Sequence, residues 1–385
     1  MNAFITAVSA FLPGKPVDNT ELDDYLGKVN KVSSRTRQII LANNGIKTRH
    51  YALDPKTGKS SHTNAKMSAE AVRLLRPDND ASNLSMECLC CGTSSADQIM
   101  PGHASMVHGE LPESGACEVV SFAGICLSGI TALKFGAMSV ALGVSQNAVA
   151  TGSELASTFM RTSFFETMTG NTNQKDEKKR HSAFSFEAEF LRWMLSDGAG
   201  AVLIEKEPNP EGTSLRIDWI ETVSHAHRLE TCMYAGAVKQ EGGSVVGWRE
   251  CAVGDSLVNS GVMTIKQDAR LLNEEIISVT VGQSLPSIIK KHDLKPEDVD
   301  WFLAHYSSEY FREPLMKQLQ DIDFPIPEEQ WFTNLSSKGN TGSASFYIML
   351  EELFSSGKLQ KGDRILGMIP ESGRFSVGWI SLTVV

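Results

Sequence analysis

The chain is short of basic residues, and this shortage argues against one large class of partner. Its 385 residues include 36 lysines and arginines against 46 aspartates and glutamates, which gives a formal net charge of −10. Proteins that bind DNA or RNA present a basic stripe that neutralises phosphates. The sequence offers no such stripe, so we do not expect nucleic acid as a partner.

Targeting and membrane-spanning segments are also missing from the sequence. The first residues have neither the basic region nor the continuous apolar run of a signal peptide. The stretch 124–144 approaches membrane-spanning length, but it contains Lys134 and several glycines, so it predicts a buried core helix. The seven cysteines are odd in number and form no regular framework, which suits a reducing compartment. We expect a cytoplasmic protein without membrane attachment.

The signals for metal and nucleotide sites are weak. His225 and His227 would share one face of a strand, with Cys232 nearby, but no second ligand pair stands at a recognisable spacing. The loop 339–343 resembles a phosphate-binding loop, yet it lacks the terminal Gly-Lys-Ser/Thr. We therefore expect neither a metal ion nor a bound cofactor.

Strand and helix patterns alternate along the chain, which is typical of the α/β class. Their order also repeats: each half has an apolar strand, a turn with a reactive side chain, a helix, and a Gly-rich entry into a closing strand. We therefore predict two similar halves, 1–207 and 208–385, joined through the proline-containing stretch 205–212. The polar run 170–180 predicts a solvated loop, although its basic end could equally contact an acidic partner.

Cys126 stands at the turn between the apolar run 117–123 and a segment of helical character. At a helix N-terminus, free backbone N–H groups and the helix dipole favour the thiolate, which attacks acyl groups. Gly124 and Gly129 leave room for an acyl carbonyl beside the backbone. The alternative is a small buried apolar residue, and this segment alone does not separate the two.

Two residues of the second half complete a possible catalytic set. His305 ends the short apolar strand 299–305, and Asn340 lies at the tip of a small-residue loop that enters a helix. Taken singly, each residue has an ordinary structural explanation. A thiol, an imidazole and a carboxamide, each at the end of a regular element, together favour acyl transfer.

Glu154 ends the predicted strand 148–154. A carboxyl group at such a position, if partly buried, has a raised pKa and can act as a general base. It could equally cap the next helix or bind neighbouring N–H groups. Both interpretations stay open on the sequence.

These motifs, in this order, resemble those of thiolase-fold condensing enzymes of the 3-oxoacyl-acyl-carrier-protein synthase III type. The resemblance runs nearly end to end, because the segments 44–50 and 197–201 also match, besides the regions around Cys126, His305 and Asn340. It implies a thiolase-like α/β fold of two similar halves with layered α-β-α-β-α packing. It also implies a homodimer.

The resemblance assigns a role to each candidate residue. Cys126 would take the acyl group as a thioester, and His305 and Asn340 would donate hydrogen bonds to the enolate oxygen of the second substrate. The backbone N–H groups of Cys126 and Gly373 would form the oxyanion hole. The substrates would be acyl thioesters carried on acyl carrier protein or coenzyme A.

The chain also departs from the synthase III pattern. Ile39 and Asn43 stand where those enzymes have a tryptophan and an arginine that hold coenzyme A. This difference favours an acyl donor bound to a carrier protein. The segment Glu371–Arg374 replaces their closing Gly-rich loop, and His305 is followed by Tyr-Ser-Ser where they have Gln-Ala-Asn.

Segments 11–17 and 41–49 are similar to those of the ketosynthases that make dialkylresorcinol and stilbene precursors. By that similarity, the enzyme would condense an acyl thioester with a 3-oxoacyl thioester. It would then cyclise the product to a 2,5-disubstituted cyclohexane-1,3-dione, with Glu154 as the base for ring closure.

Two other functions stay open on the sequence. The first is synthase III activity that initiates fatty-acid or polyketide synthesis with malonyl-carrier protein, which needs no base for ring closure. The second is a non-catalytic protein that binds acyl carriers. The complete set of Cys126, His305 and Asn340 argues against the second.

Overall fold

The computed structural model describes residues 2–28, 34–76, 85–162, 190–251 and 262–385. The polar run 170–180 lies outside these ranges. None of the helices in them combines the length and the apolar character needed to cross a membrane.

Within the described ranges, ten strands form one hydrogen-bonded sheet, and they divide evenly between the two parts of the chain. The N-terminal part contributes β1 (Phe4–Phe11), β4 (Cys88–Thr93), β5 (Glu118–Ala123), β6 (Asn147–Glu154) and β7 (Gly198–Glu205). The C-terminal part contributes β8 (Leu215–Ser224), β13 (Trp301–Ala304), β14 (Trp331–Phe332), β15 (Arg364–Glu371) and β16 (Ser376–Val384). Their order in space is β14-β13-β15-β16-β8-β1-β7-β6-β4-β5.

The two halves of this sheet have the same topology. β5, β4 and β6 run parallel, as do β14, β13 and β15. Each trio continues into two antiparallel strands, β7 and β1 in one half and β16 and β8 in the other. The halves meet where β1 pairs with β8 through Phe4 and Ile5. The predicted boundary between residues 207 and 208 falls in the connection between β7 and β8.

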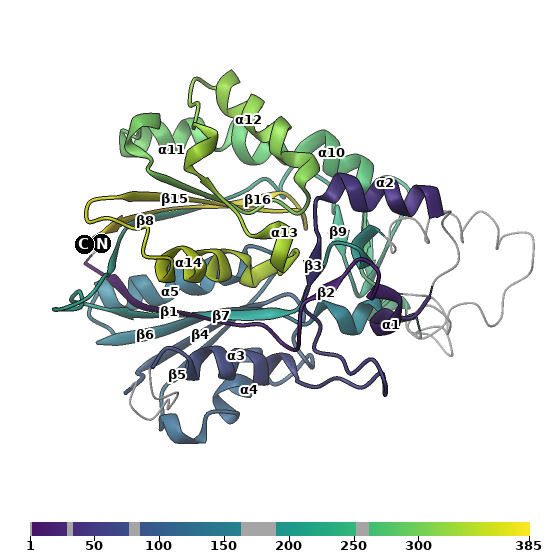
Figure 1. Cartoon of the computed structure of the whole chain (residues 1–385), viewed down its shortest axis with the longest axis horizontal. Helices are drawn as coiled ribbons and strands as arrows, with labels where there is room; N and C mark the ends of the chain where they lie inside the picture. Colours follow the sequence, from purple (N-terminus) through teal and green to yellow (C-terminus); the bar gives the residue numbers. More distant parts are fainter. Residues whose placement is uncertain (1, 29–33, 77–84, 163–189, 252–261) are drawn as a thin grey trace, which may run out of the picture.

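Helices fill the middle layer and cover both outer faces of the molecule (Figure 1). The middle layer consists of α5 (Ser128–Ala141) and α14 (Ser345–Ser355). One outer face is covered by α3 (Asn64–Arg73) and α4 (His103–Gly109), and the other by α11 (Leu285–His292) and α12 (Arg312–Asp321). This is the layered α-β-α-β-α packing that the sequence predicted.

Glycines bring the two middle helices and their preceding turns close together. A Cβ added to Gly129 of α5 would lie 2.3 Å from the carbonyl oxygen of Ser343, just before α14. A Cβ added to Gly92 of β4 would lie 2.2 Å from the carbonyl oxygen of Ser128. Only a residue without a side chain permits such approaches. As a result, the turns that precede α5 and α14 meet at one end of the layers.

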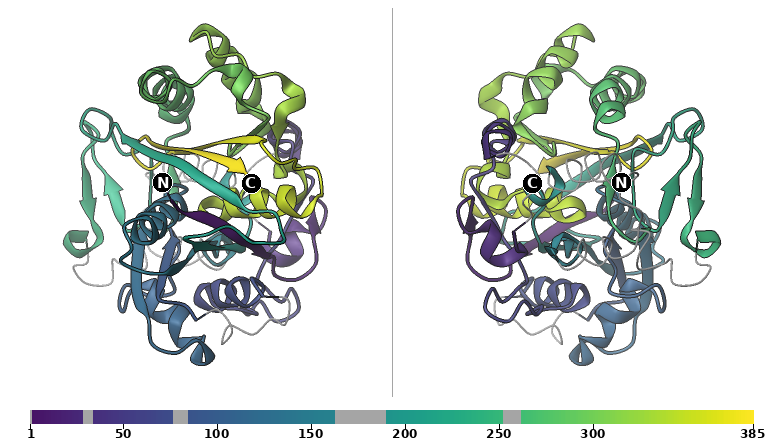
Figure 2. Two further views of the ribbon diagram at one scale, coloured as in Figure 1. Left: turned by 90° about the vertical axis from the view of Figure 1, so that its left-hand side faces the viewer. Right: turned by 90° about the vertical axis from the view of Figure 1, so that its right-hand side faces the viewer.

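Short elements surround this end of the molecule, and in Figure 2 the β10–β11 hairpin stands to one side of the layers. The short elements are β2 (Val17–Asp18), α1 (Leu22–Leu26), α2 (Ser34–Asn44), β3 (Thr48–Arg49), β9 (Met233–Tyr234), β10 (Ala237–Lys239), β11 (Val245–Gly247), α8 (Trp248–Cys251), β12 (Lys266–Gln267), α10 (Ala269–Ile277) and α13 (Leu335–Lys338).

One prediction of local structure is wrong. His225 and His227 do not share the face of a strand, because β8 ends at Ser224, where its pairing with β16 ends. The Nε2 atom of His225 lies 2.9 Å from the hydroxyl of Ser284 instead. The described residues contain no group of three His, Cys, Asp or Glu side chains that could hold a metal ion.

Candidate active site

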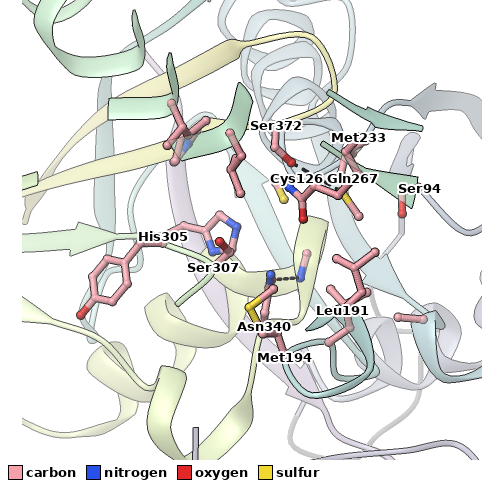
Figure 3. Close-up of a pocket in the computed structure, with 18 of the residues that line it drawn as sticks. Ser94, Cys126, Leu191, Met194, Met233, Gln267, His305, Ser307, Asn340 and Ser372 are labelled. Carbon is pink, nitrogen blue, oxygen red and sulfur yellow. Dashed lines mark hydrogen bonds between the residues drawn. The ribbon is translucent and has the colours of Figure 1, made fainter. Parts of the chain in front are cut away.

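A pocket at the end of the sheet collects side chains from both halves of the chain (Figure 3). Its lining includes Cys126, Glu154, His305 and Asn340. The space around these side chains is about 790 Å³ and includes open solvent. Much of the remaining lining is apolar, with Leu191, Met194, Met233, Ile265, Leu272 and Ile276 among it.

Cys126 lies in the turn between β5 and α5, with 8% of its surface exposed. Burial raises the pKa of the Cys126 thiol, and the carboxyl groups of Glu154 and Glu371 raise it further. The expectation that the helix N-terminus favours a resting thiolate is therefore wrong. Desolvation and two acidic neighbours outweigh the backbone N–H groups, and α5 itself begins only at Ser128. The resting side chain is a thiol.

His305 directly follows β13, and its backbone N–H donates to the carbonyl of Met368 in β15 over 2.9 Å. Burial lowers the pKa of the His305 imidazole to about 4. The ring is therefore neutral at physiological pH. A neutral imidazole has one N–H to donate and one nitrogen that can accept a proton.

Asn340 is held in place by hydrogen bonds to residues of both halves of the chain. Its backbone N–H donates to the carbonyl of Met194 over 2.9 Å, and its carbonyl accepts from the N–H of Ser196 over 2.8 Å. The side-chain Oδ1 accepts from the N–H of Gly342 over 3.0 Å. Because the oxygen of the carboxamide is engaged, the Nδ2 group is left to donate to a bound molecule.

The segment 44–50 supports the Asn340 turn from behind. The N–H of His50 donates to the hydroxyl of Ser196 over 2.9 Å, and Ser196 in turn holds Asn340. The buried Arg49 donates through Nε to the carbonyl of Trp193 over 3.1 Å. This early motif therefore acts structurally, by fixing the chain on which Asn340 depends.

Glu154 is 4% exposed, and its carboxyl group accepts four hydrogen bonds. The donors are the N–H and hydroxyl of Ser94, at 3.0 and 2.7 Å, and the hydroxyls of Ser95 and Thr93, at 3.0 and 3.3 Å. Burial raises the pKa of Glu154 to about 7, although these hydrogen bonds act to lower it. Glu154 thus binds a neighbouring N–H group and also lines the pocket, so features of both sequence interpretations are present.

Glu154 also packs directly beneath the Asn340 turn. A Cβ added to Gly342 would lie 2.4 Å from Oε2 of Glu154. Gly342 has a φ of 53°, a conformation that favours glycine. The carboxyl group of one half therefore supports the turn of the other half.

Glu371, the last residue of β15, is a residue that sequence reasoning missed. Its Oε2 accepts from the N–H groups of Ile125 and Leu127, over 3.0 and 3.2 Å, one on each side of Cys126. Burial raises the pKa of this carboxyl group as well. The available signal was a charged residue in place of the closing Gly-rich loop.

Gly373 lies beside the Cys126 turn. A Cβ added to it would lie 3.0 Å from Cδ1 of Ile125 and 3.3 Å from Oε1 of Glu371. Its carbonyl accepts from the N–H of Cys232 over 2.9 Å, which fixes the peptide plane on its far side. Its contribution to an oxyanion hole stays a prediction.

Comparison with known proteins agrees with this architecture. A model of the C-terminal region of 3-oxoacyl-acyl-carrier-protein synthase III matches residues 289–369, which include His305 and Asn340. The beta-ketoacyl-acyl-carrier-protein synthase III of Koribacter versatilis is 22% identical, over 94% of this chain and 92% of that protein. That of Clostridium perfringens is 25% identical, over 95% and 94%.

Solved structures with the same fold cover nearly the whole chain. The tetronic acid condensing enzyme AbyA1 superposes with a TM-score of 0.74 at 17% identity, over 99% of each chain. A variant of OleA from Xanthomonas campestris has a TM-score of 0.74 at 20% identity, over 100% of this chain and 98% of that one. The chain therefore has the thiolase-like fold of these enzymes, and it is similar in sequence to 3-oxoacyl-acyl-carrier-protein synthase III.

A second pocket adjoins the first and shares Leu272 and Phe311 with it. Asn43 lines this second pocket, together with Tyr310, and Ile39 is exposed. These are the two positions where the sequence departs from residues that hold coenzyme A. The preference for a carrier protein over coenzyme A stays a prediction.

Gln267 of β12 is a further residue that lines the first pocket and that sequence reasoning missed (Figure 3). It is 5% exposed, and its side chain lines the pocket. A carboxamide can donate to or accept from a polar group of a bound substrate.

Proposed function

We propose that this protein is a condensing enzyme that joins two acyl thioesters through a carbon–carbon bond. The observation that carries the proposal is the convergence of Cys126, His305 and Asn340, from three separate turns, on one largely apolar pocket. The names of the relatives support it, since they are beta-ketoacyl-acyl-carrier-protein synthases III.

In the first half-reaction, the sulfur of Cys126 attacks the carbonyl carbon of the acyl thioester. The bond to the carrier sulfur breaks, and the carrier leaves as a thiol. The neutral imidazole of His305 can take the thiol proton of Cys126 and return it to the leaving group. The N–H groups of Cys126 and Gly373 hold the intermediate oxyanion, and loss of one such donor typically costs about 3 kcal/mol of transition-state stabilisation.

In the second half-reaction, the enolate of the second substrate attacks the acyl group on Cys126. Asn340 donates from Nδ2, because its oxygen already accepts from Gly342. The N–H of the neutral His305 ring is the second donor to the enolate oxygen. The new carbon–carbon bond forms as the bond to Cys126 breaks. The free ring nitrogen of His305 takes the proton that the second substrate loses as its enolate forms, and passes it to the sulfur, which restores the thiol.

The charges at the pocket favour an uncharged second substrate. Glu154 lines the pocket, and Glu371 lies directly behind the Cys126 turn. The carboxylate of a malonyl group would meet this acidic environment at low dielectric, where repulsion between like charges is strong. A 3-oxoacyl thioester carries no charge, and the amide of Gln267, which lines the pocket, can donate to its 3-oxo oxygen.

Glu154 is the base that we assign to ring closure. Closure needs a proton to leave the carbon between the two carbonyl groups of the 3-oxoacyl unit, and the pKa of about 7 suits a base that works near neutral pH. This carbon then adds to the β-carbon of the other acyl chain, which must be α,β-unsaturated, and the proton passes to the α-carbon of that chain. Hydrolysis of the remaining thioester releases the carrier thiol, and loss of CO2 leaves a 2,5-disubstituted cyclohexane-1,3-dione, of the kind from which dialkylresorcinols and stilbenes are made.

The second candidate is synthase III activity with malonyl-carrier protein, which the names of the relatives favour. Product analysis distinguishes the two candidate functions. The protein is given an acyl thioester together with either a 3-oxoacyl or a malonyl thioester, each on carrier protein and on coenzyme A. A cyclic dione from the first pair supports the proposal. A linear 3-oxoacyl product from the malonyl pair alone supports the second candidate, and failure to acylate Cys126 contradicts both. Dimerisation and a cytoplasmic location stay predictions.

A further inference from the structure

β15 ends on a buried carboxyl group that reaches across to the turn of the proposed nucleophile. Oε2 of Glu371 accepts from the N–H groups of Ile125 and Leu127, over 3.0 and 3.2 Å. Ile125 and Leu127 lie 246 and 244 residues before Glu371 in the sequence. These two hydrogen bonds bracket Cys126 and tie its turn to the opposite half of the molecule.

Two glycines lie against this carboxyl group. A Cβ added to Gly124 would lie 3.4 Å from Oε2 of Glu371, and one added to Gly373 would lie 3.3 Å from Oε1. The carboxyl group therefore sits between the Cys126 turn and the loop that carries Gly373. It spans the two segments whose N–H groups are proposed to form the oxyanion hole.

We propose that Glu371 is a positioning residue for acyl loading. Its carboxylate fixes the Cys126 turn against the Gly373 loop and places a negative charge beside that turn. This inference rests on the proposed role of Cys126 as the nucleophile.

The positioning part follows from hydrogen-bond geometry. A carboxylate that accepts from two backbone N–H groups holds a turn more firmly than a neutral acceptor does, because such bonds are charge-assisted. An oxyanion hole requires its donors within a few tenths of an ångström of their working positions. Glu371 provides a direct link between the two loops that must keep this spacing.

The charge part follows from the groups that face Cys126. Glu154 approaches from the end of β6, Glu371 from the end of β15, and His305, which is neutral, from the end of β13. Both carboxyl groups raise the pKa of the thiol. Removal of one negative charge must lower that pKa, so the thiolate will appear at lower pH.

Two substitutions separate the two parts of the proposal. Glu371→Gln keeps the reach and an oxygen acceptor but removes the charge, whereas Glu371→Asp keeps the charge but is too short to reach both N–H groups. The reactivity of Cys126 is read from iodoacetamide alkylation of its peptide between pH 6 and about 11, by mass spectrometry. Acyl loading is read from the mass gained with an acyl thioester at one pH.

For Glu371→Gln, we expect Cys126 to be alkylated several-fold faster than in the parent at each pH of this range, because a lower thiol pKa gives more thiolate. Its loading should slow, but less than in Glu371→Asp, because a neutral oxygen still accepts from the turn, though less firmly. For Glu371→Asp, we expect the parent alkylation rate with about tenfold slower loading. Glu211→Gln, which removes one exposed charge from the connection between β7 and β8, serves as the control and should match the parent in both measurements.

An alkylation profile of Glu371→Gln that overlays the parent profile overturns the charge part. Parent-rate loading by Glu371→Asp overturns the positioning part. Alkylation measures the reactivity of the Cys126 thiol whether or not the protein condenses thioesters. If Cys126 accepts no acyl group, the proposed function fails, while the alkylation profile still tests the effect of Glu371.

Discussion

Glu154 and Glu371 occupy the same place in the two halves of the molecule. Each ends the third strand of its parallel trio, β6 in one half and β15 in the other. Each also reaches the turn of the opposite half: Glu154 packs under Gly342 next to Asn340, and Glu371 binds the turn of Cys126. Each half of the molecule thus contributes one carboxyl group that contacts a turn of the other half.

The two carboxyl groups differ in what holds them. Three hydroxyls and one N–H surround Glu154, and its side chain lines the pocket. Backbone N–H groups hold Glu371, and only its neighbours Pro370 and Ser372 are among the lining residues. Hydroxyls can rotate and exchange donor and acceptor roles, whereas backbone N–H groups cannot. The comparison therefore assigns proton transfer to Glu154 and positioning to Glu371.

The largest effect on activity is expected when the thiol of Cys126, which both carboxyl groups influence, is removed. Cys126→Ala should abolish acyl loading, because no other side chain of the pocket replaces the thiol nucleophile. Intact-mass measurement after mixing with an acyl thioester is the test. Cys117→Ala, a free cysteine outside the pocket, is the matched control and should load normally. Acylation of the Cys126→Ala protein at another pocket residue would contradict the assignment.

The next largest effect is expected on carbon–carbon bond formation, when Asn340 in the turn that packs on Glu154 is changed. Asn340→Ala should still load an acyl group but should form carbon–carbon bonds about a hundredfold to a thousandfold more slowly, because one donor to the enolate oxygen is lost. His305→Ala should also block condensation, while some loading persists. Loading and condensation are measured separately by mass spectrometry and product analysis. Normal condensation with impaired loading would reverse the assigned roles.

Ring closure should distinguish the two glutamates directly. Glu154→Gln should accumulate the linear condensation product, whereas Glu371→Gln should still form the cyclic one. In the parent, the ring-closure rate should fall about tenfold for each pH unit below 7, because the protonated Glu154 cannot accept a proton and its pKa is about 7. Parent-rate formation of the cyclic product by Glu154→Gln would make Glu154 structural only.

A smaller shift should follow from changing one donor to Glu154. Ser94 donates to the carboxylate from its hydroxyl over 2.7 Å, which lowers the pKa of Glu154. Ser94→Ala should therefore raise that pKa and move the ring-closure profile to higher pH, by less than about one unit. The pH profile of the cyclic product measures this. A shift to lower pH would mean that the hydroxyl does not stabilise the carboxylate.

The family resemblance predicted the layered fold, and the sequence singled out Cys126, His305 and Asn340, because each stands at the end of a regular element. It missed Glu371, because the two N–H groups that hold it lie more than 240 residues away. It also misjudged the charge state of Cys126. Local sequence suggests a helix N-terminus, but burial and carboxyl groups from two other strands decide the pKa. Tertiary neighbours of this kind leave no local pattern.

The central claim is that turns from both halves form one site for carbon–carbon bond formation. The most direct test loads the protein with an acyl thioester whose carbonyl carbon is isotopically labelled, removes the excess, and adds an unlabelled 3-oxoacyl thioester. The account predicts that the label leaves Cys126 and appears in the ring of the cyclic dione. Recovery of the label only as a free carboxylic acid, or its attachment to a residue other than Cys126, would contradict the account.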